Sequence, residues 1–308
     1  MQNQAIEQRL RDRPSDEATW DSYAAWLTQT GDVRGTLIQL ERSRQQTPNG
    51  TAQRRELDEQ IQQLTSNTAS WTPKVPTGTI LGWQHGFVVD ITLTLDASTA
   101  DTLRQILRDP QSRLLHSLRL QTERKPDEGE EEEEEEWDEE SLSKLPEPTL
   151  MEPARALASL DLSPLRALSF PYCLIGAEGV RAILHSPQLG KLKSLDLRYC
   201  YLGDEGAQVI AQAAVLSELE SLRLQRNGLT PRGFCSLADS PNLHALRLLD
   251  LRYNAPKTKG IEALASSTVT RTLQTLLLHR KETTKAGARA LATSPHLPLS
   301  LRRFWSAQ

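Results

Sequence analysis

The chain has 308 residues and a formal net charge of −4, from 36 Lys and Arg against 40 Asp and Glu. Three cysteines are too few for the disulfide framework of a secreted scaffold, and no run of about 18 apolar residues could span a membrane. The first residues also lack the apolar core of a secretion signal. We therefore expect a cytoplasmic protein.

The acidic residues are unevenly distributed along the chain. Residues 127–140 contain 12 Asp and Glu and no Lys or Arg. Because 40 minus 12 leaves 28 acidic residues against 36 basic ones, the remainder of the chain has a net charge of +8. The near-neutral total thus conceals a basic body that carries an acidic tract.

The first 66 residues have apolar side chains at helical spacing. Breaks between helices are expected at Gly31-Asp32 and at residues 47–50, where Thr, Pro, Asn and Gly follow one another. We predict a small all-helical domain over residues 1–66. The apolar stripes consist of Trp20, Tyr23, Ala24, Leu27, Val33, Leu37, Leu40, Leu57, Ile61 and Leu64.

Residues 23–45 combine aromatic side chains with a Gly-Asp-Val-Arg-Gly motif. The distinctive positions are Tyr23, Trp26, Leu27, Gly31, Asp32, Arg34 and Gly35. On these residues the segment resembles the bacterial repeat-companion domain, a module found beside repeat arrays. The resemblance implies a bacterial protein with a repeat array further along the chain.

Residues 67–87 are rich in proline and glycine, which predicts a tight connector that also caps the following array. The first unit of a repeat stack needs such a cover, because no neighbour packs on its core. Trp83 and Phe87 are the side chains available for that role.

A pattern of 27 residues repeats in the C-terminal half, beginning at Leu165, Leu192, Leu219, Leu246 and Leu273. When each of these leucines is counted as position 1, apolar residues also occupy positions 4 and 6, and glycine occupies position 15. After the glycine, the apolar spacing changes from that of a strand to that of a helix. A strand and a helix of this size bury their apolar faces only by stacking on neighbouring repeats.

The pattern Leu-x-x-Leu-x-Leu-x-x-Asn-x-Leu followed by a helix resembles leucine-rich repeats of the ribonuclease-inhibitor type. The resemblance implies an α/β solenoid, a horseshoe with parallel strands on its concave side and helices on its convex side. Two earlier repeats fit the same register from Val88 and Leu115, so we assign residues 88–308 to the array. Seven strands are expected, with a possible eighth after Leu299, where Phe304 and Trp305 would cover the core.

The second repeat is longer than the others by 23 residues, which places an acidic insertion at about residues 123–147. Its seven consecutive glutamates, residues 130–136, are too densely charged for a packed core and are expected to be disordered. Two hypotheses remain for this insertion. It is a solubilising loop, or it docks on the arginines of the same chain until a partner displaces it.

Position 9 of the repeat is occupied by Cys173, Cys200, Asn227, Asn254 and Lys281. The resemblance implies that this residue points into the coil and bonds to neighbouring backbone, so both cysteines are predicted to be structural. Since adjacent strands lie about 5 Å apart, distance leaves a disulfide between them open. The third cysteine, Cys235, is expected to pack on a helix.

The exposed strand positions carry an uneven set of side chains. Arginine and tyrosine recur at positions 5, 7 and 8, and these residue types are favoured at the energetic centres of protein interfaces. We predict a partner-binding platform on the concave side, with an ordinary solvated strand surface as the alternative. The predicted binding residues are Tyr172, Arg198, Tyr199, Arg223, Arg226, Arg252, Tyr253, His279 and Arg280, interspersed with Asp196 and Asp250.

An unidentified protein with an acidic surface is the favoured partner, which indicates a non-enzymatic interaction scaffold or adaptor. Nucleic acid is a second possibility, because arginines bind phosphates and tyrosines stack on bases. Asp196 and Asp250 would however repel a phosphate backbone. Some horseshoe proteins of this type stimulate small GTPases, so a regulator of a small GTPase is a further alternative.

No catalytic constellation is found in the sequence. The six histidines are scattered along the chain, and there is no phosphate-binding loop, nucleophile elbow or paired-cysteine motif. No cysteine and histidine spacing is typical of a zinc site. We therefore predict no enzymatic activity, no cofactor, no metal site and no association with membranes.

Overall fold

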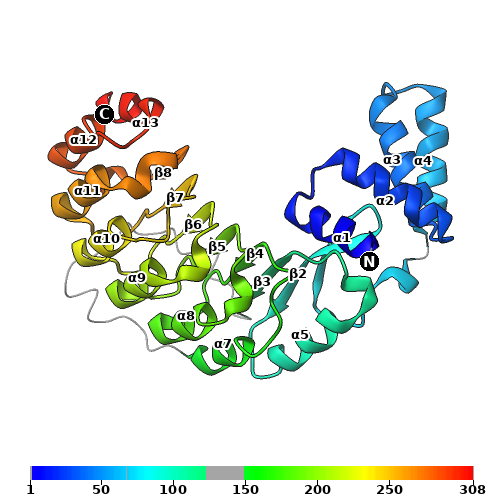
Figure 1. Cartoon of the computed structure of the whole chain (residues 1–308), viewed down its shortest axis with the longest axis horizontal. Helices are drawn as coiled ribbons and strands as arrows, with labels where there is room; N and C mark the ends of the chain where they lie inside the picture. The colour runs from blue at the N-terminus through cyan, green and yellow to red at the C-terminus, as the bar shows by residue number, and fades with distance from the viewer. Residues whose placement is uncertain (1, 67, 123–148, 308) are drawn as a thin grey trace, which may run out of the picture. The chain divides into compact units, whose positions relative to one another are not determined.

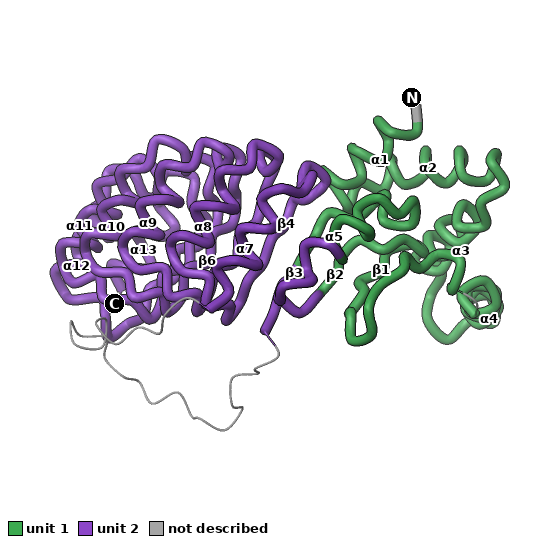
Figure 2. Tube along the Cα trace, turned by 90° about the horizontal axis from the view of Figure 1, so that it is seen from below, with its two compact units in different colours: residues 1–92, 102–118 green, residues 93–101, 119–308 purple. Residues whose placement is uncertain are grey.

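A computed structural model describes residues 2–66, 68–122 and 149–307 of the protein (Figure 1). The chain divides into two compact units, one formed by Met1–Thr92 and Thr102–Leu118, the other by Leu93–Asp101 and Arg119–Gln308 (Figure 2). The acidic insertion expected at about residues 123–147 lies outside the described residues. The domain limits inferred at residues 66 and 87 stay predictions.

Four helices come first in the first unit, where the apolar spacing predicts helical structure. The Asp16 carboxylate caps α2, because it accepts a hydrogen bond from the backbone N–H of Thr19. Gly31, with a φ of 78°, occupies the break before α3 without the strain that a side chain would cause there. The helices are α1 (Gln2–Asp12), α2 (Glu17–Gln29), α3 (Arg34–Gln46) and α4 (Ala52–Thr65).

The expected connector contains a 3-10 helix, η1 (Ala69–Trp71), and a strand, β1 (Ile80–Gln84). Strand β1 pairs antiparallel with β2 (Phe87–Thr94) through a two-residue turn of His85 and Gly86. Both turn residues have positive φ, 51° and 76°, as tight hairpin turns require. Strand β1 was not expected from the sequence, because the glycines of this segment indicated breaks rather than a hairpin.

The two aromatic residues expected to cover the array behave differently. Phe87 is fully buried in the first unit, with its ring centroid 6.2 Å from that of Trp20 and 5.6 Å from that of Tyr23. Trp83 keeps 40% of its surface exposed. The prediction that Trp83 covers a core is therefore wrong, because a shift in strand register between Gly82 and Trp83 interrupts the alternation of β1.

The repeats predicted from Val88 and Leu115 each contain a strand. Val88, Ile91 and Leu93 are buried in β2, and Leu118 and Leu120 are buried in the next strand. The elements that follow β2 are α5 (Thr99–Arg108), η2 (Pro110–Ser112) and β3 (Ser117–Gln121).

Five parallel strands of the second unit follow the 27-residue period. Leu168 pairs in register with Leu195, and the same pairing continues through Leu222 to Leu249 and Leu276. All five leucines are buried, so the repeating leucines form one continuous ladder. The strands keep chain order in the sheet from β1 to β8. The five are β4 (Ala167–Ser169), β5 (Ser194–Asp196), β6 (Ser221–Arg223), β7 (Leu248–Asp250) and β8 (Thr275–Leu277).

A helix alternates with each of these strands, and Figure 1 shows the helices stacked in a row along one side of β4–β8. They are α7 (Met151–Leu157), α8 (Gly176–Leu184), α9 (Gly203–Gln212), α10 (Pro231–Ala238), α11 (Lys257–Ser266) and α12 (Lys285–Ala292). Short 3-10 helices complete several repeats: η3 (Pro187–Leu189), η4 (Ala214–Leu216), η5 (Thr268–Thr272) and η6 (Arg280–Glu282). Of the described helices, none has the length and apolar character needed to cross a membrane.

The chain ends in a helix, α13 (Leu299–Ser306), rather than in an eighth repeat strand. Seven repeat strands, β2 to β8, match the expected number, and the eighth strand of the sheet is β1 at its beginning. Trp305 is buried as predicted, whereas Phe304 is 53% exposed. Because consecutive residues of a helix point in different directions, the two rings cannot both face the core.

Candidate functional site

Position 8 of four successive repeats has an unusual backbone conformation. The φ angles are positive at Tyr172 (63°), Tyr199 (58°), Arg226 (50°) and Tyr253 (59°). The backbone N–H groups of the first three extend the inter-strand ladder beyond the strands; that of Tyr199, for example, donates to the Gln225 carbonyl at 2.9 Å. The left-handed conformation costs a residue with a side chain about 1–2 kcal/mol, so small residues or asparagine usually occupy it.

The side chains at this position stack on one another or, for Tyr253, on His279, which occupies position 7 of the last repeat. The rings of Tyr172 and Tyr199 lie 4.3 Å apart and nearly parallel, and those of Tyr253 and His279 lie 4.9 Å apart. The Arg226 guanidinium lies 5.7 Å from the centre of the Tyr199 ring. We call these five residues the aromatic row. The structure thus brings together side chains that the sequence predicted only as members of separate repeats.

Two identical ion pairs lie beside the aromatic row. The Arg198 Nε and Nη2 donate to the two Asp196 oxygens, each at 2.9 Å, and Arg252 contacts Asp250 in the same bidentate way at 3.0 and 2.8 Å. These hydrogen bonds to the carboxylates raise the pKa of both arginines above the ordinary value. Each arginine charge is therefore largely balanced by its own repeat.

Both aspartates are buried, with 6% of Asp196 and 2% of Asp250 exposed. The expectation that they face solvent and repel a phosphate backbone is therefore wrong. They lie beneath the arginines because the bidentate geometry folds each guanidinium back over its carboxylate. The register places Arg223 opposite both aspartates, and its Nη1 donates to the Ser221 hydroxyl at 3.3 Å.

Gln225 is a member of this surface that was not predicted from the sequence. It occupies position 7 between Arg198 and Arg252, is 7% exposed, and its Oε1 has no hydrogen-bond partner among the described residues. Only its position in the repeat marks Gln225 in the sequence, because its side chain is neither charged nor aromatic. We call the aromatic row, the two ion pairs, Arg223 and Gln225 the strand platform.

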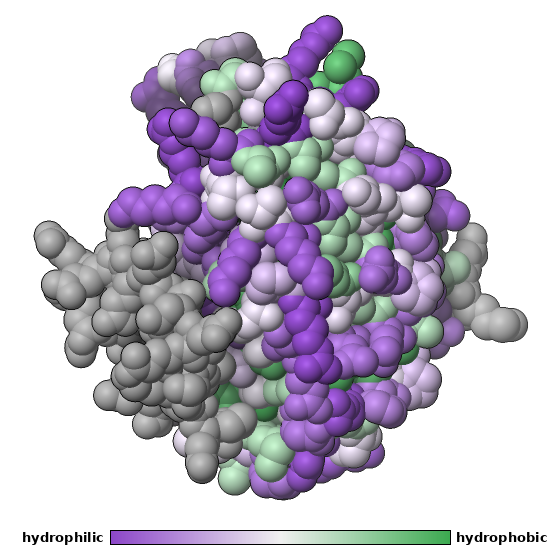
Figure 3. Space-filling view, turned by 90° about the vertical axis from the view of Figure 1, so that its left-hand side faces the viewer, coloured by the Kyte–Doolittle hydropathy of each residue, from purple (hydrophilic) through white to green (hydrophobic). Residues whose placement is uncertain are grey.

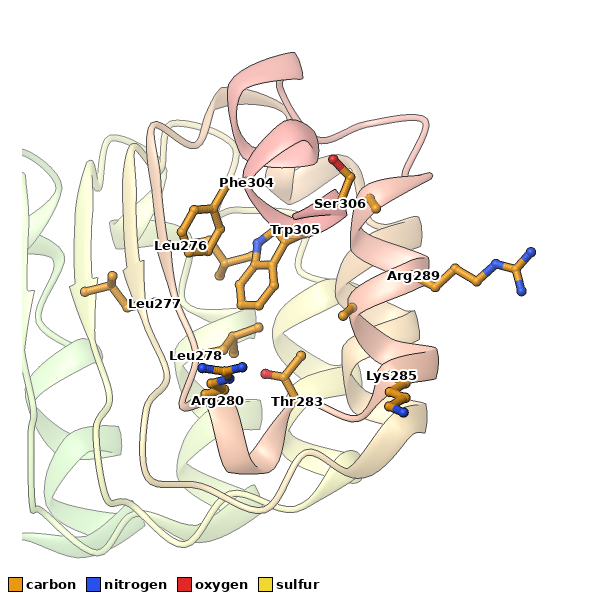
Figure 4. Close-up of a pocket in the computed structure, with 12 residues that line it drawn as sticks. Leu276, Leu277, Leu278, Arg280, Thr283, Lys285, Arg289, Phe304, Trp305 and Ser306 are labelled. Carbon is orange, nitrogen blue, oxygen red and sulfur yellow. The ribbon is translucent and has the colours of Figure 1, made fainter. Parts of the chain in front are cut away.

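Arg280 is not part of this platform. It lies in η6, after the last repeat strand, and lines a cavity with Leu278 and Thr283 (Figure 4). The structure therefore separates it from the other predicted binding residues. The cause is the last repeat, in which a 3-10 helix begins directly after His279.

Four of the five residues at position 9, Cys173, Cys200, Asn227 and Asn254, point into the stack and bond to neighbouring backbone as predicted, whereas Lys281 is exposed. The Cys200 thiol donates to the Phe170 carbonyl at 2.9 Å, and the Asn227 amide donates to the Leu197 carbonyl at 2.8 Å. The Asn227 Oδ1 in turn accepts from the Cys200 backbone N–H at 3.1 Å. Each of the four thus ties one repeat to the preceding or following one.

The thiols are structural groups. Burial raises the pKa of Cys173 to about 12 and that of Cys200 well above its ordinary value. A thiol that stays protonated is a poor nucleophile and a poor metal ligand. All three cysteines, including Cys235 on α10, are free of disulfides.

Glu282 replaces asparagine in the last repeat. Lys281 occupies position 9 there, and the Glu282 carboxylate instead accepts hydrogen bonds from the backbone N–H groups of Asn254, Tyr253 and His279. Burial raises its pKa to about 7, although these hydrogen bonds lower it. The sequence could have indicated this role, because Lys281 occupies a position that requires a hydrogen-bond acceptor and Glu282 follows it directly.

The first unit contains a charged cluster that is satisfied internally. The Tyr23 hydroxyl donates to Glu7 at 2.8 Å and accepts from the Arg113 Nε at 2.9 Å, and burial raises its pKa. Arg34 forms an ion pair with Asp32 at 2.6 Å. Tyr23, Asp32 and Arg34 belong to the motif that resembles a repeat-companion domain. These hydrogen bonds and this ion pair indicate that the three residues stabilise this unit.

Comparison with known proteins is consistent with the repeat register. A family model described as leucine-rich repeat matches residues 191–211, which span β5 and nearly all of α9. The match supports leucine-rich repeats in this part of the chain. A search of proteins with curated functions gives no match to this chain. Within the described ranges, no group of three His, Cys, Asp or Glu residues is placed to hold a metal ion.

Proposed function

We propose that the chain is a non-enzymatic scaffold or adaptor that binds a protein partner on the strand platform. Leucine-rich repeats are in general a protein interaction fold, because stacked repeats offer an extended surface. The observation that carries the proposal is the left-handed backbone of Tyr172, Tyr199 and Tyr253, with φ angles of 58° to 63°.

Tyrosine is conformationally unfavourable at these three positions. Asparagine or glycine adopts this backbone conformation at less cost, and stacking with a neighbouring ring recovers about 0.5–1.5 kcal/mol of free energy. The stacks therefore offset the strain without giving a clear stability gain. Strained residues in a row on one surface favour a role in recognition, and tyrosine and arginine are typical of the centres of interfaces.

The charge distribution favours a protein over a nucleic acid. A nucleic-acid surface depends on uncompensated cations that contact phosphates. Arg198 and Arg252 are each paired with a buried carboxylate, which lowers the net charge of the strand platform. The result is a polar and aromatic surface with few free charges, which suits the mixed surface of a protein partner.

The proposal also includes the repeat type, the identity of the N-terminal helices and the cellular setting that the sequence suggests. We infer ribonuclease-inhibitor-type repeats with the strand platform on their concave side. We also infer a repeat-companion domain in the N-terminal helices and a cytoplasmic, bacterial setting. Docking of the acidic insertion on the platform arginines stays a hypothesis.

Affinity capture with a tyrosine variant tests the proposed function. The triple tyrosine variant carries Tyr172→Asn, Tyr199→Asn and Tyr253→Asn, which remove three rings and suit the left-handed backbone. We expect the parent chain to capture a protein from a bacterial lysate and the variant to lose it. Charge reversal of Arg198 or Arg252 is a poorer test, because it would leave a buried aspartate unpaired and unfold the repeat.

Tyr201→Asn is the matched control, because Tyr201 also has a positive φ, 53°, and lies outside the aromatic row. This control should capture the same protein as the parent chain. Nuclease treatment of the lysate should leave the capture unchanged, whereas its loss would indicate bound nucleic acid. Equal capture by the parent and by the triple tyrosine variant would contradict the proposed function.

A further inference from the structure

A cavity of about 640 Å³ lies at the C-terminal end of the repeats. Strand β8 and η6 form one wall, and α12 and α13 form the others, so the cavity belongs entirely to the second unit (Figure 4). Its size is within the range of about 300–1,000 Å³ that is typical of small-molecule sites.

The cavity lies at the last described repeat, where α13 follows in place of another repeat strand. The apolar residues that α12 contributes to the lining are Ala288 and Ala292, and α13 contributes the rings of Phe304 and Trp305. Figure 4 shows the Trp305 ring between Leu276 and Leu278 on one side and α12 on the other. Leu276 and Leu278 are 4% and 9% exposed, so the walls are apolar.

The charges at the cavity are all of one sign. Among the described residues that line it, Arg280, Lys285 and Arg289 are charged and none is Asp or Glu; Glu282, the acidic residue of η6, is not part of the lining. None of the three cations forms an ion pair within the described part of the chain. Figure 4 shows Arg280 beside Leu278 and Thr283, whereas Arg289 points away from the cavity.

The Trp305 indole adds an unsatisfied donor. Only 6% of this residue is exposed, and its Nε1–H has no hydrogen-bond partner among the residues described. Buried donors are normally paired, so this end of the stack is incompletely closed. Figure 3, which faces this end of the molecule, shows hydrophobic surface between rows of hydrophilic side chains.

We propose that this cavity binds a small amphipathic monoanion, an alkyl or aryl body with one carboxylate. The apolar walls fit the body, and the Arg280 guanidinium offers the donors that pair best with a carboxylate. The absence of lining acids favours an anion over a neutral or cationic molecule of the same shape. This site is separate from the strand platform, so the proposal does not depend on the proposed function.

Calorimetric titration of the full chain with decanoate tests the proposal, with decanol as the uncharged ligand of the same length. We expect decanoate to bind with one site per chain and decanol to bind more weakly. Arg280→Gln should weaken decanoate binding by about tenfold, the effect of one charged hydrogen bond, and leave decanol binding unchanged. The triple tyrosine variant should bind decanoate as the parent does.

A variant that fills the cavity separates binding there from binding elsewhere. Ala288→Phe should abolish binding of both ligands, and Ala292→Leu is the smaller replacement should Ala288→Phe fail to fold. The proposal is overturned if decanoate does not bind the parent chain, if a folded cavity-filling variant still binds it, or if decanol binds equally well.

Discussion

Single residues inside the stack connect the repeats through their backbone. Asn227 and Asn254 each donate to a carbonyl of the preceding repeat, at 2.8 and 2.9 Å, and accept from a backbone N–H there. Cys200 makes only the donor contact with its thiol. Buried backbone groups need partners, because an unpaired one loses about 1–3 kcal/mol of stability. This requirement explains why position 9 is polar or sulfur-containing in a core of leucines.

Glu282→Gln should make the last repeat less dependent on pH. The fold raises the pKa of Glu282 from 4.5 to about 7, so it favours the neutral carboxyl. The stabilising contribution is thus complete below about pH 4.5 and is lost as the pH rises through about 7. Glutamine keeps an acceptor and carries no charge. We expect the variant to be more stable than the parent at about pH 8 and similar at about pH 5.

Urea unfolding at both pH values, followed by circular dichroism, measures this difference. The parent chain is its own control, because the glutamine variant retains every other titratable group. A stability difference that is the same at both pH values would show that the Glu282 charge has no part in it.

At the scale of elements, the helices approach one another closely at the glycine of position 15. A Cβ atom on Gly260 of α11 would lie 3.0 Å from the Phe234 Cβ of α10, and one on Gly287 of α12 would lie 3.0 Å from the Ile261 Cγ2 of α11. Both distances are shorter than ordinary van der Waals contact. At Gly260 and Gly287 the recurring glycine is therefore explained by helix packing, not by backbone conformation.

Gly260→Ala should destabilise the protein by about 1–2 kcal/mol, because overpacking between α10 and α11 outweighs the better helix propensity of alanine. Gly190→Ala is the matched control. Gly190 has a φ of −61°, and a Cβ there would meet only the Pro187 carbonyl oxygen at 3.8 Å. This control should gain about 0.4–1 kcal/mol through the unfolded state. Thermal unfolding of both variants measures these changes in stability. An equal change in the two variants would contradict the packing explanation.

The repeat register predicted the strands and helices of the second unit because the apolar residues at positions 1, 4 and 6 are buried together in each 27-residue repeat. Strand β1 and helix α13 lie outside that register. The structure of β1 depends on pairing with β2, and that of α13 depends on packing against the last repeat. For the strand platform, position in the repeat predicted most members. Burial of Asp196 and the participation of Gln225 depend on cross-strand neighbours, which spacing along one chain does not reveal.

At the scale of the whole molecule, the stack of repeats separates two kinds of side chain. The leucine ladder and the position 9 residues face the core and hold the repeats together. The strand platform lies on the opposite face of the same strands. The proposed function requires that the platform tyrosines serve binding and not folding. The acidic insertion contributes nothing to this conclusion, since it lies outside the described residues.

The free energy of unfolding of the triple tyrosine variant tests that requirement most directly, and it needs no knowledge of the partner. The relief of backbone strain at three left-handed positions and the loss of ring stacking should nearly cancel. We therefore predict that the free energy of unfolding of the variant lies within about 1 kcal/mol of the parent value. A loss of about 3 kcal/mol or more, the size expected for removing a core aromatic residue, would show that the tyrosines hold the fold together.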